Sequence, residues 1–360
     1  MPKNNSVKAL VLFSGGLDSM LAVELLRRQG IAVRALCFTS AFFDAQKARQ
    51  SAAALGVNLL EKDISAAHLA LVKNPPHGWG AGANPCLDCH ALMVKTAGEL
   101  LKPKGGFSFI ATGDPTALSV TLRAAKGKSV GFEETIVDKV SDGPFDFIAT
   151  GEVLGQRPFS QTKSSLRFVE KNSGIGGCLL RPLSAKLLDE TIPEREGLVD
   201  REQLLALSGR GRLVQAALAR EWGISDYPQP AGGCILTQAS YGQKLKNIFQ
   251  IWPECTKDDV ALLSLGRHFF RPNVSPNILI VLGRNKEEND KLPLLAKKGD
   301  WLVKMTARSG PMALLRPISG QRNNLEDAFG FLEEAKKLIL DFTKNSDYSE
   351  GVNWKVWGKN

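Results

Sequence analysis

The sequence predicts an α/β fold, with a parallel sheet covered by helices, then a mainly helical segment and a small C-terminal α+β domain. Two observations predict it: strand and helix patterns alternate near the N-terminus, and strand-like apolar runs return after residue 275. A chain of 360 residues is long enough for two or three domains. Its 43% hydrophobic and 23% charged residues exclude a mainly disordered, collagenous or disulfide-scaffold chain.

The N-terminal elements follow in a regular order. Apolar runs predict strands at 7–13, 31–39 and 56–63, and helical periodicity predicts helices at 17–30 and 44–55. Strand, helix, strand, helix, strand implies right-handed parallel crossovers with helices on both faces of the sheet. Ligands of such sheets bind at the carboxyl ends of the strands, so we expect the chemistry there.

A repeated segment complicates the next part of the chain. After a predicted helix at 87–101, Phe-x-Phe-Ile-Ala-Thr-Gly occurs at 107–113 and again at 145–151. One pair of copies is not a repeat array, and an insertion of about 114–146 explains it more simply. We expect the second copy to supply the next strand, because Gly-Gln-Arg-Pro follows it.

Three domains and a tail are expected: 1–178, 179–274, 275–345 and 346–360. Within them, helical patterns predict helices at 204–207, 212–222 and 325–342. Strand-like apolar runs predict strands at 277–282, 301–305 and 312–316. The final segment reads as a polar tail.

Charge and cysteine content restrict the setting. The net charge of +9 is spread along the chain, which favours polyanionic partners such as nucleic acid without locating a patch; an ordinary soluble protein is the alternative. Six cysteines are too few for a secreted disulfide framework. Without a long apolar run or room for a signal peptide before the first strand, we expect a cytoplasmic protein with no membrane partner.

The first strand–helix turn carries Ser-Gly-Gly-Leu-Asp-Ser. Gly15 and Gly16 let the backbone approach a ligand, and the helix N-terminus offers N–H groups to an anion. Ser14 and Ser19 add hydroxyl donors, and Asp18 either holds Mg²⁺ through water or caps the helix. The alternative is a plain turn. The motif is neither a Walker A loop nor a dinucleotide fingerprint.

This motif resembles the pyrophosphate-binding loop of the PP-loop ATPases, whose fold is adenine nucleotide alpha hydrolase-like. That family adenylates a carbonyl oxygen and releases pyrophosphate, so that a nucleophile can displace AMP. It includes tRNA thiouridine synthases, GMP synthetase, NAD synthetase and asparagine synthetase. The resemblance implies that the five loop residues named above bind ATP with Mg²⁺, and that Gly151 closes over the nucleotide at the end of a strand.

Three cysteines form a second signal. Cys86 and Cys89 make a CxxC pair followed by His90, and Cys234 lies on a glycine-rich loop. The pair by itself fits a surface redox pair or half of a zinc site that His90 or Cys178 completes. Together the three thiolates can hold a [4Fe–4S] cluster with one iron open to hydrosulfide.

The set is similar to the tRNA 2-thiouridine and 4-thiouridine synthases. Cys89 and Cys234 match two cysteines of the 2-thiouridine enzymes. Cys86 stands where many of those enzymes carry an aspartate, which favours an iron–sulfur form over a persulfide pair, with zinc as the alternative. The resemblance implies an ATP-dependent tRNA sulfurtransferase in which these three cysteines are catalytic. The sulfur donor, the modified uridine and the oligomeric state stay open.

Basic residues expected to contact phosphate or RNA are Arg157, Arg181, Lys186, Arg210 and Arg212. Residues 281–292, 299–302 and 309–315 resemble the RNA-binding domain of ribosome-quality-control NFACT proteins, which implies a tRNA-holding role; a plain packing domain is the alternative. Two rival functions are a PP-loop enzyme acting on a small molecule and a non-catalytic RNA-binding protein with a structural zinc site.

Overall fold

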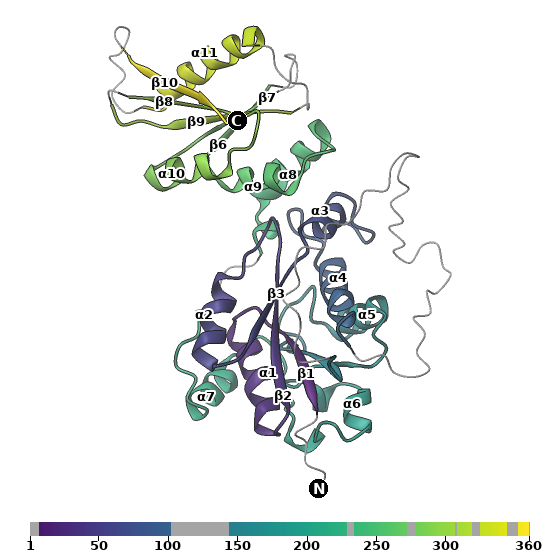
Figure 1. Ribbon diagram of the computed structural model, residues 1–360. Helices are drawn as coiled ribbons and strands as arrows, with labels where there is room; N and C mark the ends of the chain where they lie inside the picture. The colour runs from purple at the N-terminus through teal and green to yellow at the C-terminus, as the bar shows by residue number, and fades with distance from the viewer. Residues whose placement is uncertain are drawn as a thin grey trace. The chain divides into compact units, whose positions relative to one another are not determined.

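The computed structural model describes residues 7–101, 144–228, 234–271, 278–306, 308–318, 325–343 and 352–359 (Figure 1). The first repeat copy and nearly all of the expected insertion lie outside these residues. The chain divides into two compact units. The first unit comprises Met1–Thr39, Phe43–Trp79 and Pro85–Gly232, and the second comprises Ser40–Phe42, Gly80–Asn84 and Gly233–Asn360.

The first unit is built on a five-stranded parallel sheet, as the sequence predicts. Its strands are β1 (Lys8–Leu12), β2 (Ala32–Thr39), β3 (Leu59–Asp63), β4 (Phe147–Thr150) and β5 (Leu179–Leu180). Their order is β3-β2-β1-β4-β5, and every neighbouring pair is parallel. The carboxyl ends of β1 and β4 therefore lie side by side at the middle of one sheet edge.

Helices cover both faces of this sheet (Figure 1). The helices are α1 (Leu17–Arg28), α2 (Gln46–Leu55), α3 (Ser65–Lys73), α4 (Cys86–Gly98), α5 (Lys163–Ser173), α6 (Ile192–Arg195) and α7 (Leu213–Glu221). Side chains alternate along β1, so that Ala9 and Val11 share a buried core with α1, α2 and α7. Leu10 faces the other way, into a core with α4 and α5.

Residues 179–228 belong to the parallel sheet unit instead of forming a separate helical domain. β5 extends the sheet and α7 packs against α1. The helix expected at 204–207 is wrong: a short 3-10 turn at Arg201–Gln203 is followed by extended chain. The amide of Leu205 donates to the carbonyl of Pro182 at 3.0 Å, so this leucine-rich segment satisfies its backbone across a loop.

The second unit is a five-stranded antiparallel sheet with helices. Its strands are β6 (Arg267–Arg271), β7 (Ile278–Leu282), β8 (Trp301–Met305), β9 (Met312–Pro317) and β10 (Trp354–Gly358), in the order β10-β8-β9-β7-β6. The helices are α8 (Ala239–Ile251), α9 (Lys257–Ala261), α10 (Lys286–Leu295) and α11 (Leu325–Asp341). α11 covers one face of the sheet, where buried side chains of β7, β8 and β9 meet it.

The expected strands at β7, β8 and β9 and the last long helix are confirmed. The expected tail differs, since β10 pairs with β8 and gives the sheet an edge strand. The unit also begins well before residue 275, because β6 and the helices preceding it fold with this sheet. No helix in the described part of the chain combines the length and apolarity needed to cross a membrane.

Candidate nucleotide and thiol site

The loop between β1 and α1 is tightly seated. Gly15 has a φ of +75°, and a Cβ placed there would lie 2.6 Å from the carbonyl oxygen of Lys47. The Ser51 hydroxyl donates to the Gly15 carbonyl at 2.8 Å. Both the dihedral and the close contact with α2 therefore require glycine at position 15.

The loop hydroxyls act largely on the loop itself. The Gly16 amide donates to Oγ of Ser14 at 3.3 Å, and the Ser19 hydroxyl donates to the Gly16 carbonyl at 2.7 Å. Gly16 is the N-cap residue of α1, and no side chain caps this helix, so Asp18 is not its cap. The first N–H groups of a 12-residue helix thus face the end of β1, where an anion binds well.

Asp18 is held from two sides. Its Oδ2 accepts from Nε2 of Gln156 at 2.9 Å and from Nη2 of Arg212 at 3.4 Å. Within the described residues, Asp18 Oδ1 and Gln156 Oε1 are buried acceptors with no hydrogen-bond partner. Carboxylate and amide oxygens are ligands that Mg²⁺ prefers, so these residues fit that ion.

The end of β4 touches the predicted phosphate-binding loop, residues 14–19. A Cβ at Gly151 would lie 2.5 Å from the carbonyl carbon of Asp18 and from the amide nitrogen of Ser19. Only glycine allows this contact between β4 and the first turn of α1. Gly151 therefore lies against the loop, and Glu152, the next residue, contacts His90.

Glu152 connects this point with the cysteine helix. It accepts from the Thr150 hydroxyl at 3.1 Å and from Nε of Arg181 at 3.0 Å, and its other oxygen lies 3.0 Å from Nδ1 of His90. Burial opposes ionisation of Glu152, but the charges of Arg181 and His90 outweigh it and lower its pKa to about 2. A permanent carboxylate thus fixes His90, the residue that follows Cys89.

Histidines surround the start of α4. Sγ of Cys89 lies 3.2 Å from Nε2 of His68, and Nδ1 of His77 lies 2.6 Å from Oδ1 of Asp88. Burial lowers the pKa of His68 to about 4, so His68 is neutral near pH 7. Sequence reasoning assigned no role to these histidines, because they come from distant positions and have no motif spacing.

The third cysteine belongs to the other unit. Cys234 lies in the second unit, which also contains Gly80–Asn84, the stretch leading into Cys86. Within that unit the Ala83 amide donates to the Leu236 carbonyl at 2.9 Å. No group of three or more His, Cys, Asp or Glu side chains suited to a metal ion exists among the described residues, so the structure gives no support to the expected [4Fe–4S] cluster or to the zinc alternative.

Two of the five residues expected to contact phosphate are bonded instead to other protein groups of the first unit. Arg181 is 4% exposed and bonded to Glu152, and it also lies 3.6 Å from Glu170. Nζ of Lys186 donates to the Glu202 carbonyl at 2.7 Å.

The remaining three differ from one another. Arg157 and Arg210 are exposed, whereas Arg212 is half-buried and contacts the phosphate-binding loop through Asp18.

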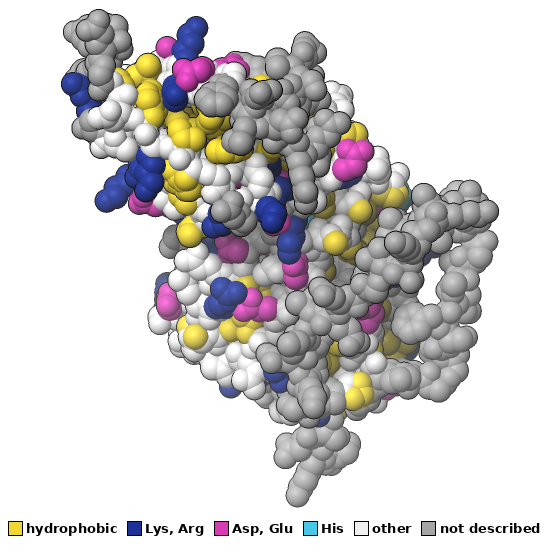
Figure 2. Space-filling view, turned by 45° about the horizontal axis from the view of Figure 1, so that its top comes forward, with side chains coloured by type: hydrophobic (Ala, Val, Ile, Leu, Met, Phe, Trp, Pro, Cys, Tyr) yellow, Lys and Arg dark blue, Asp and Glu magenta, His cyan; other side chains and the backbone are white. Residues whose placement is uncertain are grey.

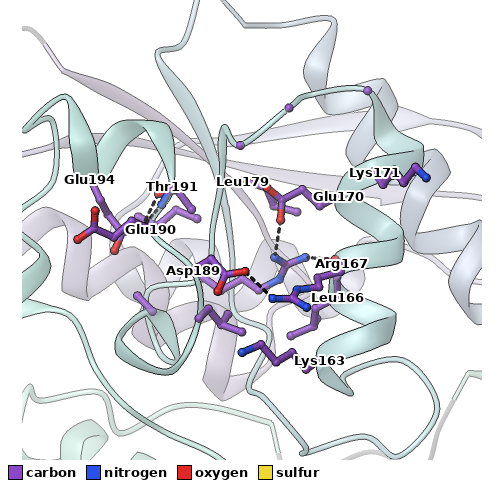
Figure 3. Close-up of a pocket in the computed structure, with 17 residues that line it drawn as sticks. Lys163, Leu166, Arg167, Glu170, Lys171, Leu179, Asp189, Glu190, Thr191 and Glu194 are labelled. Carbon is purple, nitrogen blue, oxygen red and sulfur yellow. Dashed lines mark hydrogen bonds and ion pairs between the residues drawn. The ribbon is translucent and has the colours of Figure 1, made fainter. Parts of the chain in front are cut away.

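A cavity of about 510 Å³ lies beside β5 at the edge of the parallel sheet. Figure 3 shows Arg167 and Lys171 of α5 on one side and Glu190, Thr191 and Glu194 on the other. Four basic and four acidic side chains line it, so their charges offset one another. The phosphate-binding loop is not part of its lining, but Arg181 is, which links the cavity wall to Glu152.

Two opposed lysines lie on β10, an edge strand of the second sheet, and on its neighbour β8. Lys355 of β10 pairs directly with Lys304 of β8, and Nζ of Lys355 lies 5.4 Å from the ring centroid of Trp357. Like charges directly opposite in a sheet are destabilising, so a bound anion would relieve this pair. Elsewhere, Figure 2 shows lysine and arginine side chains dispersed over the visible described surface, in keeping with the spread excess of charge.

Comparisons with known proteins give weak similarities. No protein-family model and no curated protein matches the chain. A predicted subunit of tRNA methyltransferase from Methanocaldococcus jannaschii is 14% identical with a TM-score of 0.33, covering 60% of this chain and 76% of its own. NAD+ synthetase from Burkholderia pseudomallei is 17% identical with a TM-score of 0.27, covering 71% and 77%. At these values neither similarity assigns a function.

Proposed function

We propose that the chain is an ATP-dependent tRNA sulfurtransferase of the PP-loop type. One observation carries the proposal: the end of β4 joins the two motifs. Gly151 lies against the phosphate-binding loop, and Glu152 holds the histidine that follows the CxxC pair. An anion-binding loop and a pair of thiols beside one strand end suit a reaction that activates a carbonyl and then replaces its oxygen.

Adenylation is the proposed first step. ATP places its phosphates at the N–H groups of the first turn of α1, whose dipole favours negative charge. The uridine carbonyl oxygen forms a bond to the α-phosphorus while the bond to the bridging oxygen breaks, and the electron pair leaves with pyrophosphate. Asp18 and Gln156 would hold Mg²⁺, which supplies charge neutralisation at the phosphates.

Sulfur transfer is the proposed second step. Cys86 and Cys89 lie on the first turn of α4, where a helix N-terminus favours thiolate. Hydrosulfide attacks the activated carbon, the bond from that carbon to the AMP oxygen breaks with its electron pair leaving on AMP, and loss of the S–H proton leaves the thiocarbonyl. Cys234 is proposed as the third cysteine, as the resemblance of the sequence to the thiouridine synthases implies. Metal analysis distinguishes an iron–sulfur centre from zinc and from persulfide.

The second unit is proposed to hold tRNA. Lys304 and Lys355 provide two adjacent cations for phosphate, and Trp357 provides an aromatic face beside them. The site lies partly on β10, which the sequence resemblance did not cover.

The test combines unmodified tRNA, Mg²⁺-ATP and sulfide under anaerobic conditions. We expect thiouridine by mass spectrometry together with AMP and pyrophosphate. Cys86→Ala and Cys234→Ala should abolish the thionucleoside, whereas Cys37→Ala should not, because burial raises the pKa of the Cys37 thiol to about 11 and keeps it inert.

Other product patterns would contradict the proposal. AMP and pyrophosphate without thionucleoside would indicate a small-molecule substrate. Neither product, with tRNA still bound, would indicate a non-catalytic RNA-binding protein.

A further inference from the structure

We propose that Arg212, and not its neighbour Arg210, is a catalytic residue that binds the departing pyrophosphate. The inference rests on the proposed adenylation at the phosphate-binding loop and assigns to one side chain a role that the sequence left shared between two. Both arginines belong to one Gly-Arg-Gly-Arg turn, so neither composition nor spacing separates them.

The turn is fixed to the strand end that touches the loop. The Gly209 amide donates to the Leu154 carbonyl at 2.8 Å, and Leu154 and Ser208 form a parallel bridge. The Ser184 hydroxyl donates to the Leu207 carbonyl at 2.7 Å and accepts from the Leu154 amide at 3.0 Å. One side chain therefore clamps both segments, and the turn is held in place before any ligand binds.

Arg212 extends from this turn to the loop. Arg212 directly precedes α7, and α7 packs against α1, the helix that begins at the phosphate-binding loop. This packing fixes the backbone of Arg212 relative to the loop. Its guanidinium lies 3.4 Å from Oδ2 of Asp18, and its side chain is 34% exposed. Arg210 is exposed to solvent on the same turn.

Asp18 is the partner that Arg212 contacts when no nucleotide is bound. The ion pair between Arg212 and Asp18 is long, at 3.4 Å, whereas a polyphosphate carries several charges and matches the planar fork of arginine. When ATP binds, we expect the phosphates to replace Asp18 at the guanidinium, while Asp18 keeps its hydrogen bond from Gln156.

The chemical role follows from where charge develops. As the carbonyl oxygen bonds to the α-phosphorus, the bridging bond breaks and its electron pair leaves with pyrophosphate. The guanidinium stays protonated throughout and neutralises that charge from a position already set. Arg212 thus acts on the leaving group and not on the sulfur chemistry.

The test compares Arg212→Ala and Arg212→Lys with Arg210→Ala, and uses Arg220→Ala, on the exposed far end of α7, as the neutral control. The readouts are pyrophosphate binding by calorimetry, the rate of AMP and pyrophosphate formation, and tRNA affinity. We expect Arg212→Ala to lower kcat by about 100-fold and to weaken pyrophosphate binding at least about tenfold, with unchanged tRNA affinity. Arg212→Lys should recover part of both, and Arg210→Ala should retain wild-type pyrophosphate affinity.

Two results would overturn the inference: an Arg212→Ala enzyme with wild-type pyrophosphate binding, or a loss confined to tRNA affinity. A wild-type protein that forms no AMP would contradict the proposed function instead. In that case pyrophosphate binding to the same variants still decides whether Arg212 contacts the phosphates.

Discussion

Each unit buries one arginine between carboxylates, but the two arginines serve different ends. Arg316 on β9 is fully buried, with Nη2 2.6 Å from Asp300 and Nη1 3.0 Å from Asp259. Arg181 is almost as buried, between Glu152 and Glu170. The two arginines differ in which further residues their carboxylate partners contact.

In the second unit the network closes on itself. Asp259 forms a further ion pair with Lys297 and accepts from the Thr256 amide at the start of α9, so these partners all belong to the second unit. In the first unit Glu152 also holds His90, and Arg181 lines a cavity. The same ion-pair chemistry is therefore structural in one sheet and positions side chains beside the candidate site in the other.

The largest effect is expected for Arg316→Met. It leaves Asp300 buried without its cation and Asp259 paired only with Lys297, which costs about 3–5 kcal/mol of unfolding free energy. Urea unfolding followed by circular dichroism should show the loss, with pyrophosphate binding by the first unit retained. Lys291→Met, which removes an exposed pair with Glu287, is the control and should cost at most about 0.5 kcal/mol. An Arg316→Met cost below that of the control would break the comparison.

A smaller loss of stability is expected for Arg181→Met, about 2–3 kcal/mol, because Glu152 keeps its contacts with Thr150 and His90. The rate of thionucleoside formation should fall more than this loss of unfolding free energy explains, because Glu152 positions His90. We expect slower thionucleoside formation in protein that is still folded. Glu170→Gln, which removes only the outer contact, is the matched control. Equal activities of the two variants would show that the Arg181 network is structural as well.

Lowering the pH should reduce the unfolding free energy of both units, for the same physical reason. Burial lowers the pKa of His68 in the first unit and of His268 in the second to about 4. The unfolded chain takes up these protons near pH 6.5 and the folded chain does not. Unfolding free energy should therefore fall as the pH drops from about 6.5 to 4. Urea midpoints across this range should fall less steeply for His68→Gln and His268→Gln than for wild type; unchanged slopes would contradict the assignment.

The smallest effect on stability, with a clear effect on binding, is expected for Lys304→Glu. It converts a repulsive cross-strand pair with Lys355 into an attractive one, which should raise the unfolding free energy by about 0.2–1 kcal/mol. Binding to single-stranded RNA should weaken, and the slope of log affinity against log salt should fall by about 0.7 for the lost phosphate contact. Lys298→Glu, at an exposed site before β8, is the control. Unchanged RNA affinity would remove this edge from the proposed interface.

Much of the fold was predictable because apolar periodicity reports burial. The strands and helices of the first 63 residues and the last three predicted strands appear where expected. β5 has two residues, too few for a periodic signal. β10, Trp-Lys-Val-Trp-Gly, alternates over its first three residues, but this short signal near the end of the chain was interpreted as part of a polar tail. The leucines at 204–207 suggested a helix, but backbone bonds to Pro182 and Leu183 hold them extended.

The candidate site was predictable only where a motif is contiguous. The phosphate-binding loop and the CxxC pair could be located from adjacent residues. His68, His77 and Glu152 could not, because the fold brings them to α4 from separate segments. Arg210 and Arg212 were indistinguishable in sequence, and the contact with Asp18 separates them.

The products formed from ATP test the central claim most directly. With Mg²⁺, unmodified tRNA and sulfide, the phosphate-binding loop is expected to direct cleavage between the α- and β-phosphates. We expect AMP and pyrophosphate in equal amounts, in step with the thionucleoside. ADP and inorganic phosphate, or nucleotide turnover that does not depend on tRNA, would contradict the account.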